Sequence, residues 1–201
     1  MAISIDQIKQ LREETSAGIL DCRKALEQAN GDFQAALEFL REKGLATAAK
    51  RADRETYEGM IELYSHGNGR VGVMVEVNCE TDFVARSEAF RTFAHEIALQ
   101  IAAASPRYVR DEDIPSEVLE AETEAARRLA LDEGKPEAVI ERIIEGRLAK
   151  FKNENTLLRQ PYIRDEEITV EKLLLQNIAS IGENIVIRRF ERWELGEQRE
   201  E

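Results

Sequence analysis

Residues Val71–Phe90 read VGVMVEVNCETDFVARSEAF, and their hydrophobic period changes from two residues to that of a helix. A β-strand with one buried face is predicted by the alternating positions Val71, Val73, Val75, Val77 and Cys79. Ser87 is expected to cap a helix whose buried face carries Phe90, Phe93, Ala94, Ile97, Ala98 and Ile101. Between them lies Thr81–Val84, where an acidic residue stands beside an aromatic one at a strand-to-helix joint.

Two further segments predict strands that pair with Val71–Cys79. In YEGMIELY, residues 57–64, the positions Tyr57, Gly59, Ile61 and Leu63 alternate with the others. The intervening SHGNGR contains Gly67 and Gly69, which can supply the positive φ of a hairpin turn. Near the end of the chain, NIVIRRFERW is expected to be another strand. The sequence therefore predicts an antiparallel sheet of about three strands.

Residues 1–44 are expected to form a compact UBA-like module of three short helices. Ser4 and Gln7 resemble a capping box at the start of the first helix. Asp32 is expected to cap the third helix, and Gly44 is expected to end it. Because its core is small, this module is expected to be the less stable part of the chain.

The remaining segments complete an α+β fold. Two helices, one from about Ser116 and one from about Pro136, are separated by a short joint at Gly134, which predicts an antiparallel helix pair. A loop around Pro161 precedes a further helix that is closed by Gly182. The expected domains are the module 1–44, a linker helix 45–56, an α+β core 57–196 and a polar tail 197–201.

Charge and composition exclude several classes of protein. The 201 residues carry a net charge of −12, which would repel nucleic acid, so a nucleic-acid-binding structural protein is disfavoured. The two cysteines, Cys22 and Cys79, have no CxxC spacing, which predicts reduced thiols and a cytoplasmic protein. No run approaches the roughly 20 apolar residues that a membrane helix needs.

The sequence offers no basis for an enzyme. His66 and His95 are the two histidines, and neither is placed with a nucleophile in an arrangement that supports covalent catalysis. No GxxxxGK[ST] motif is present, so nucleotide binding by a phosphate loop is not expected. We therefore expect no catalytic residue, no metal site and no cofactor.

Three blocks of the chain carry a family resemblance. LREETSAGILDCRKALEQANGD, EVNCETDFVAR and IGENIVIRRF, in this order, resemble translation elongation factor Ts. The resemblance implies a guanine nucleotide exchange factor for the GTPase EF-Tu in translation elongation. The chain is too short for the second core subdomain and protruding coiled coil of long members, so it resembles the short form. Short forms are implied to be homodimers through the core, and no cysteine near the C-terminus could link such a dimer covalently.

The resemblance also implies two sets of partner-binding residues. One set would contact EF-Tu·GDP and displace its Mg²⁺, which promotes GDP release so that GTP can bind: Thr81, Asp82, Phe83 and Val84. The other would dock the N-terminal module on the GTPase domain: Ile19, Leu20, Arg23 and Lys24. Ile19 and Leu20 follow Gly18 where many members have Gly-Met-Met, so their apolar character is kept without the flexibility of methionine.

Simpler interpretations of the same residues remain open at the level of sequence. Thr81 or Asp82 could merely cap the next helix, Phe83 could fill the core, and Val84 could pack beneath the loop. Leu20 could belong to the core of the three-helix module. A different class of function, a UBA-like adaptor that binds a peptide or a ubiquitin-like fold, would explain residues 1–44 but leave the larger domain without a role.

Overall fold

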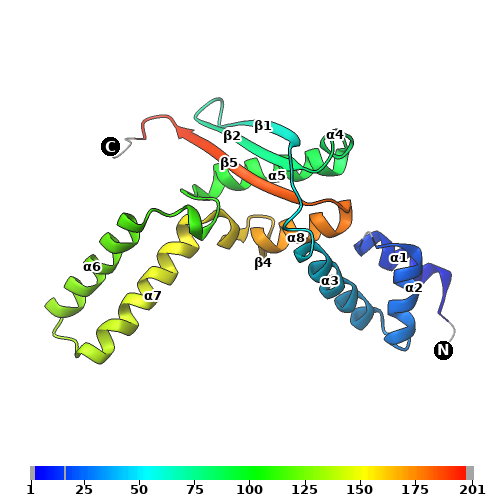
Figure 1. Cartoon of the computed structure of the whole chain (residues 1–201), viewed down its shortest axis with the longest axis horizontal. Helices are drawn as coiled ribbons and strands as arrows, with labels where there is room; N and C mark the ends of the chain where they lie inside the picture. The colour runs from blue at the N-terminus through cyan, green and yellow to red at the C-terminus, as the bar shows by residue number, and fades with distance from the viewer. Residues whose placement is uncertain (1–2, 16, 198–201) are drawn as a thin grey trace. The chain divides into compact units, whose positions relative to one another are not determined.

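The computed structural model describes residues 3–15 and 17–197, and it confirms the α+β class (Figure 1). The chain forms two compact units that interleave along the sequence. The first comprises Met1–Met60, Val77–Ala94 and Lys172–Val186, and the second Ile61–Glu76, His95–Glu171 and Ile187–Glu201. Of the predicted tail 197–201, the part beyond Glu197 lies outside the described residues.

The predicted three-stranded antiparallel sheet is present, with the strand order β1-β2-β5. These strands are β1 (Glu58–His66), β2 (Val71–Cys79) and β5 (Ile185–Glu194). The hairpin turn between the first two is confirmed, since φ is positive at Gly67, Asn68 and Gly69. Arg70 closes the turn by donating its backbone N–H to the carbonyl oxygen of His66 at 3.0 Å.

The expectation of one buried face holds for β2 but is wrong for β1. Val73, Val75, Val77 and Cys79 are buried, whereas Ile61 and Leu63 are exposed. The opposite face of β1 is turned toward helix α5 (Glu88–Ala104), because Glu62 lies 2.8 Å from His95 of that helix. An apolar alternation therefore predicted the strand correctly and its buried side incorrectly.

The N-terminal module consists of the three predicted helices, α1 (Ile5–Thr15), α2 (Ile19–Gln28) and α3 (Phe33–Ala49). The capping box is confirmed, since Gln7 and Ser4 exchange hydrogen bonds through N–H groups and side-chain oxygens at 3.1 Å. Asp32 caps α3 by accepting the N–H of Ala35 at 3.1 Å. The buried core of the module is Leu11, Cys22, Ala25, Leu26, Ala36, Leu37 and Leu40.

Gly44 does not end the third helix as expected. Helix α3 continues through it to Ala49, and residues 50–54 then form turns rather than a separate linker helix. A Cβ at Gly44 would stand only 3.2 Å from the Cβ of Ala179, in helix α8 (Val170–Ile181). The glycine therefore serves the close packing of two helices, and its intrinsic cost of about 1 kcal/mol does not break a helix rich in strong helix formers.

The second unit contains the predicted antiparallel helix pair, α6 (Ser116–Asp132) and α7 (Glu137–Asn155), which lie side by side (Figure 1). Ala126, Ala130, Ile140 and Ile144 form the buried seam between them. The expected loop around Pro161 instead contains a small antiparallel pair, β3 (Pro161–Tyr162) and β4 (Asp165–Thr169). β3 has only two residues and β4, DEEIT, is mostly acidic, so neither shows the apolar alternation that would have predicted it.

Short 3₁₀ turns and ion pairs fix the ends of the helix pair. The turns are Asp111–Asp113 and Leu157–Arg159. Arg159 holds Asp111 with two hydrogen bonds of 2.6 Å, and Lys152 lies 3.3 Å from the same carboxylate. These hydrogen bonds from Arg159, with a smaller effect of Lys152, lower the pKa of Asp111.

Candidate functional site

The Thr81–Val84 joint is ordered as a single helical turn. This turn, α4, spans Asp82–Ala85 and is capped by Thr81, whose hydroxyl accepts the backbone N–H of Val84 at 3.4 Å. Ser87 in turn caps the start of α5, since its hydroxyl accepts the N–H of Phe90 at 3.3 Å. The capping role considered for Thr81 is therefore correct, and it fixes the direction in which the next residues project.

Phe83 points away from the protein. Its side chain is 81% exposed, so the interpretation that Phe83 fills the core is wrong. Val84 is half-buried beneath the turn. Exposing a whole phenyl ring to water is unfavourable by about 2 kcal/mol relative to burying it, so Phe83 adds nothing to the core of this protein.

Asp82 is engaged in a contact that the sequence did not predict. Its carboxylate lies 3.0 Å from the guanidinium of Arg86, one helical turn later. Arg86 is mostly exposed and Asp82 is partly exposed, so the ion pair adds little to stability. The carboxylate can therefore leave Arg86 for another donor or cation at small energetic cost.

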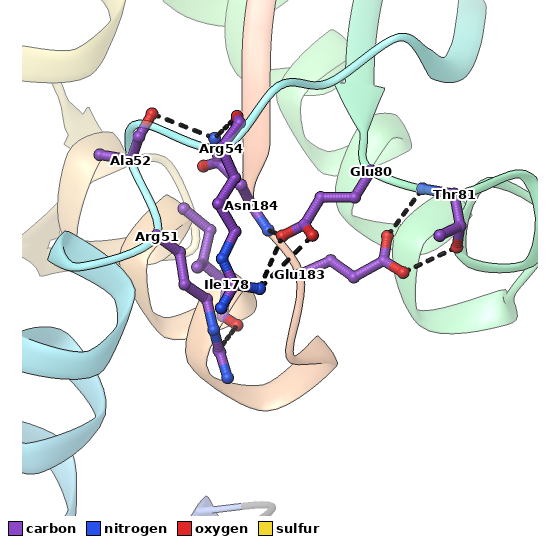
Figure 2. A network of polar contacts seen from close by, with 8 residues as sticks. All are labelled: Arg51, Ala52, Arg54, Glu80, Thr81, Ile178, Glu183 and Asn184. Atoms are coloured by element: carbon purple, nitrogen blue, oxygen red, sulfur yellow. Dashed lines mark hydrogen bonds and ion pairs between the residues drawn. The ribbon is translucent and has the colours of Figure 1, made fainter.

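A polar network connects the residues just before this turn to the segment between α8 and β5 (Figure 2). Glu183 accepts two hydrogen bonds from Thr81, one from the backbone N–H at 3.0 Å and one from the hydroxyl at 2.7 Å. The preceding residue, Glu80, accepts the backbone N–H of Asn184 at 2.6 Å. Two consecutive residues before the turn are thus tied to two consecutive residues between α8 and β5.

The same network reaches the segment that follows α3. The buried amide of Asn184 donates to the carbonyl oxygens of Ala52 and Arg54, at 3.2 and 2.8 Å. Arg51 donates to the carbonyl oxygen of Ile178 in α8 at 3.1 Å. Figure 2 shows the contacts of Asn184 between α8 and β5, and the contact of Arg51 within α8. The segment that follows α3 and the residues Glu80 and Thr81, which precede the helical turn that carries Phe83 (the Phe83 turn), are therefore held by two neighbouring residues, Glu183 and Asn184.

Cys79, at the end of β2, packs beneath the Phe83 turn, and its thiol is not reactive. Its buried thiol lies 3.2 Å from the carbonyl oxygen of Thr81. Burial, with a further contribution from Glu183, raises the pKa of Cys79 to about 11. The thiol is therefore protonated at neutral pH and acts as a small buried apolar group.

The start of α2 presents a second exposed apolar group. Ile19 is 58% and Leu20 71% exposed, so the interpretation that Leu20 belongs to the module core is wrong. Arg23 and Lys24 are exposed on the next turn, and Arg23 pairs with Glu27 at 2.9 Å. All four predicted residues therefore lie on the accessible start of one helix.

No arrangement of enzymatic type accompanies these surfaces in the described residues. His95 lies against Glu62, and His66 lies 3.0 Å from the hydroxyl of Tyr64. Within residues 3–15 and 17–197, no group of three or more His, Cys, Asp or Glu side chains has a geometry suited to a metal ion. No described helix is both long enough and apolar enough to cross a membrane.

Comparison with known proteins identifies the family of this chain. A family model described as "Elongation factor TS" matches residues 7–177. The chain belongs to the elongation factor Ts family. It is 61% identical over 195 residues to elongation factor Ts of Caldanaerobacter subterraneus subsp. tengcongensis, covering 97% of this chain and 98% of that relative. It is 58% identical to the protein of Carboxydothermus hydrogenoformans and 56% identical to that of Moorella thermoacetica, over 97% of this chain and 90% and 96% of the relatives.

Membership of the elongation factor Ts family implies a nucleotide exchange factor for EF-Tu in translation elongation, and not a catalyst of covalent chemistry. The match also weighs against the adaptor interpretation. An adaptor would account for residues 1–44 only, whereas the family model extends through most of the remaining chain.

An additional surface on this member of the elongation factor Ts family was not predicted. Leu63 of β1, Met74 of β2 and Trp193 of β5 line one hollow on the open side of the sheet. Leu63 is 70% and Trp193 68% exposed. A patch of this kind on a sheet face is unusual for a surface that meets only water. The apolar alternation of Ile61 and Leu63 in β1 was the signal that could have revealed it.

Sequence reasoning also missed the residues that support the Phe83 turn. Glu80, Glu183 and Asn184 are polar residues in connecting segments, and Glu183 and Asn184 are far from Thr81 in sequence. The only available signal was their presence in the blocks EVNCETDFVAR and IGENIVIRRF, which carried the resemblance without assigning a role to either residue.

Proposed function

We propose that this protein binds EF-Tu·GDP, displaces its Mg²⁺ through the turn Thr81–Val84, and so promotes release of GDP and binding of GTP. The N-terminal module provides a separate contact through Ile19, Leu20, Arg23 and Lys24. The protein requires no cofactor for this activity, and its net charge of −12 argues against direct binding to nucleic acid. Its site of action is the cytoplasm, where translation elongation takes place.

One observation carries the proposal: a phenyl ring is exposed on a helical turn whose first residue is anchored by hydrogen bonds. Phe83 is exposed, while Thr81 is bonded to Glu183 and caps α4. A flexible loop would lose conformational freedom when it enters a partner, and this loss would weaken binding. A ring that is already held in place can be inserted between two elements of a partner at much lower cost.

The physical route to GDP release passes through the metal ion. A translation GTPase holds its nucleotide with phosphate-loop amides, a lysine and a Mg²⁺ that bridges phosphate oxygens. The ion is a large part of the local charge, and groups outside its first coordination shell tune its affinity. In our proposal Phe83 displaces elements that carry these outer groups. Asp82 adds a negative charge and a hydrogen-bond acceptor, after exchanging its contact with Arg86 for one in the partner.

The N-terminal module contributes affinity rather than release. Ile19 and Leu20 form an apolar tip beside the cations Arg23 and Lys24, a combination typical of a docking contact. Burying these two side chains against EF-Tu removes apolar surface from water without changing the fold of the module. The module would therefore set the concentration at which the exchange factor works, while the Phe83 turn sets the maximal rate.

Thermodynamic linkage limits what this interface can do. If the factor weakens nucleotide binding by some ratio, the nucleotide weakens binding of the factor by the same ratio. Each tenfold change in affinity corresponds to about 1.4 kcal/mol. An aromatic contact such as Phe83 typically contributes about 2–4 kcal/mol, enough for about a hundredfold effect. The rest of the interface has to provide any larger acceleration.

We further propose that the protein is a non-covalent homodimer, with the open face of the sheet as the interface. The hollow lined by Leu63, Met74 and Trp193 supports this assignment, because two copies of one apolar sheet face can pack together as a sandwich. Both cysteines are buried and free, so neither is available for an intermolecular disulfide. This role would belong to the 57–196 core, as expected for a dimerisation domain.

Nucleotide exchange provides the test. EF-Tu loaded with fluorescent GDP is mixed with excess unlabelled GDP and about one-fiftieth its concentration of this protein. We expect all of the label to be released at an accelerated rate, because an exchange factor turns over. Release at the spontaneous rate, or release of only one-fiftieth of the label, would contradict the proposal. A pull-down that captured a ubiquitin-like protein but not EF-Tu would instead support the adaptor interpretation.

A further inference from the structure

The segment Gly182–Asn184, at the start of IGENIVIRRF, has no role in the function proposed above. We propose that Glu183 is a positioning residue that holds the Thr81–Val84 turn in the orientation needed for nucleotide exchange. This inference rests on the proposed function of that turn. It goes further because Glu183 itself need not touch EF-Tu.

The contact with Thr81 uses both oxygens of the Glu183 carboxylate. One oxygen accepts the Thr81 hydroxyl at 2.7 Å and the other accepts its backbone N–H at 3.0 Å. A carboxylate that accepts two donors from one residue fixes both the position and the rotation of that residue, as no single hydrogen bond could. Glu183 is half-buried, so this contact is not one of the fully solvated surface pairs that contribute little.

The hydroxyl of Thr81 links this contact to the cap of α4. A hydroxyl has one proton to donate and two lone pairs that accept. Because the proton is given to Glu183, a lone pair is left to accept the N–H of Val84 at 3.4 Å. Glu183 thereby selects the hydroxyl rotamer that caps the turn. Phe83 lies within that turn, so its direction depends on Glu183 through Thr81.

The support of Glu183 is itself rigid. Gly182 ends α8 with φ = +91°, a conformation that glycine adopts readily. Asn184 is 2% exposed and is bonded to Glu80, Ala52 and Arg54. Glu183 is therefore held between a helix end and a buried asparagine. The carboxylate is fixed before EF-Tu arrives, which is the condition for orienting another group.

A positioning residue has a kinetic signature that distinguishes it from a docking residue. Loss of the Glu183 contact would let the turn adopt several orientations, of which few are productive. The N-terminal module would still dock, so the protein concentration that gives half-maximal exchange should change little. The maximal rate of GDP release should fall, because misplacement of a working group by about 1 Å can cost as much as a hundredfold.

The test compares Glu183→Gln with Glu141→Gln in the full-length protein. Glu141 is likewise a glutamate that accepts a hydrogen bond, but its partner is Arg127, at 2.8 Å, in the α6–α7 helix pair. For each variant, release of fluorescent GDP from EF-Tu is measured over a range of variant concentrations. We expect Glu183→Gln to lower the maximal rate about tenfold. We expect its half-maximal concentration to stay within about twofold of the parent, and Glu141→Gln to match the parent in both values.

Two further measurements separate orientation from loss of fold. Thr81→Val removes the hydroxyl, and the double variant Thr81→Val/Glu183→Gln should be no slower than the slower single variant if both act through one contact. Amide hydrogen exchange should accelerate at Thr81 and Val84 in Glu183→Gln, while the amides of β2 keep their protection.

The inference is overturned if Glu183→Gln retains the parent's maximal rate while Phe83→Ala loses it, since the proposed function would then stand without a role for Glu183. It is also overturned if the rate loss follows the unfolded fraction of the variant. If the parent protein itself fails to accelerate GDP release, the proposed function fails and this inference fails with it.

Discussion

Gly59 in β1 lies directly against the carbonyl oxygen of Val77 in β2. A Cβ at Gly59 would stand 2.2 Å from that oxygen and 2.7 Å from the Cα of Asn78, and its φ of +147° is strained for other residues. The contact occurs just before the base of the Phe83 turn, since Cys79 and Glu80 follow. Because Gly59 has no side chain, the backbone of β2 at Val77 and Asn78 can pack directly against β1.

Gly59→Ala should therefore destabilise the protein. The added methyl would collide with backbone atoms, which cannot move away as the tip of a flexible side chain could. We expect a loss of about 2–4 kcal/mol in the free energy of unfolding, measured by urea denaturation. Gly146→Ala in α7 is the matched control, because a Cβ there meets nothing within 4 Å. The control should be stabilising by about 0.5–1 kcal/mol, and equal effects of the two changes would contradict the account.

Hydrophobic periodicity was a sufficient signal for some elements of the fold and not for others. Period alone predicted β2 and the buried face of α5. The alternating residues of β2 are buried as expected, namely Val73, Val75, Val77 and Cys79, and so are the predicted apolar residues of α5 from Phe90 to Ile101. Local patterns could not reveal long-range contacts. Gly44 resembled a helix end, although its function is to let α3 approach Ala179. Gly59 resembled an ordinary strand position, although it meets the backbone of Val77.

Leu20→Ala should weaken binding to EF-Tu without weakening the fold. Leu20 is mostly exposed, so its truncation leaves no cavity in the module. We expect the half-maximal concentration for nucleotide exchange to rise about tenfold, as for a typical interface anchor, with the maximal rate nearly unchanged. Ile5→Ala on α1 removes an equally exposed apolar side chain and should have no effect on exchange.

Leu26→Ala provides the opposite case in the same helix. Leu26 is fully buried in the core of the module, and truncation should cost about 2–5 kcal/mol. A change in exchange caused by Leu26→Ala should disappear at low temperature, where the module refolds, whereas that of Leu20→Ala should persist. Leu20→Ala with parental exchange kinetics would remove the module from the proposed interface.

Leu63→Asp should convert a dimer into a monomer. A carboxylate placed in the hollow formed with Met74 and Trp193 would have to lose its hydration on association, at a cost of several kcal/mol. Sedimentation velocity should give the mass of two chains for the parent and of one chain for the variant. Leu131→Asp, at an exposed leucine near the end of α6, should leave the mass unchanged. A parent that sediments as a monomer at all concentrations would contradict the proposed dimer.

Stability at low pH should depend on Glu96. Hydrogen bonds from Arg164, at 2.5 and 2.9 Å, and a weaker effect of the Tyr162 hydroxyl at 2.6 Å lower the pKa of Glu96. A carboxylate with a lowered folded-state pKa contributes stability above its unfolded pKa, and this contribution is lost as pH falls through the folded pKa. Glu96→Gln should therefore be less stable than the parent by about 1 kcal/mol at pH 7, with the difference vanishing near pH 2. Thermal unfolding across this range measures it, and a difference independent of pH would refute the assignment.

The sequence predicted the exposed residues of the candidate site, but it did not predict the residues that support them. Thr81–Val84 could be found because a strand pattern and a helix pattern leave this segment between them, and because the resemblance gave it a role. Arg86 and Glu183 could not be found. Arg86 is one of many i, i+4 charges on helices, and Glu183 meets Thr81 only after the chain has folded.

The ring of Phe83 is proposed to act on the metal ion of EF-Tu, and one experiment tests this action most directly. Stopped-flow release of fluorescent GDP from EF-Tu should be measured with saturating parent or Phe83→Ala, with Tyr57→Ala as an exposed aromatic control, both at millimolar Mg²⁺ and after chelation of the ion. We expect Phe83→Ala to be about a hundredfold slower than the parent and the control with Mg²⁺ present. The gap should narrow to less than about tenfold without the ion, because there is then no Mg²⁺ to displace. A Phe83→Ala variant as fast as the parent, or a gap that is the same with and without Mg²⁺, would contradict the proposed mechanism.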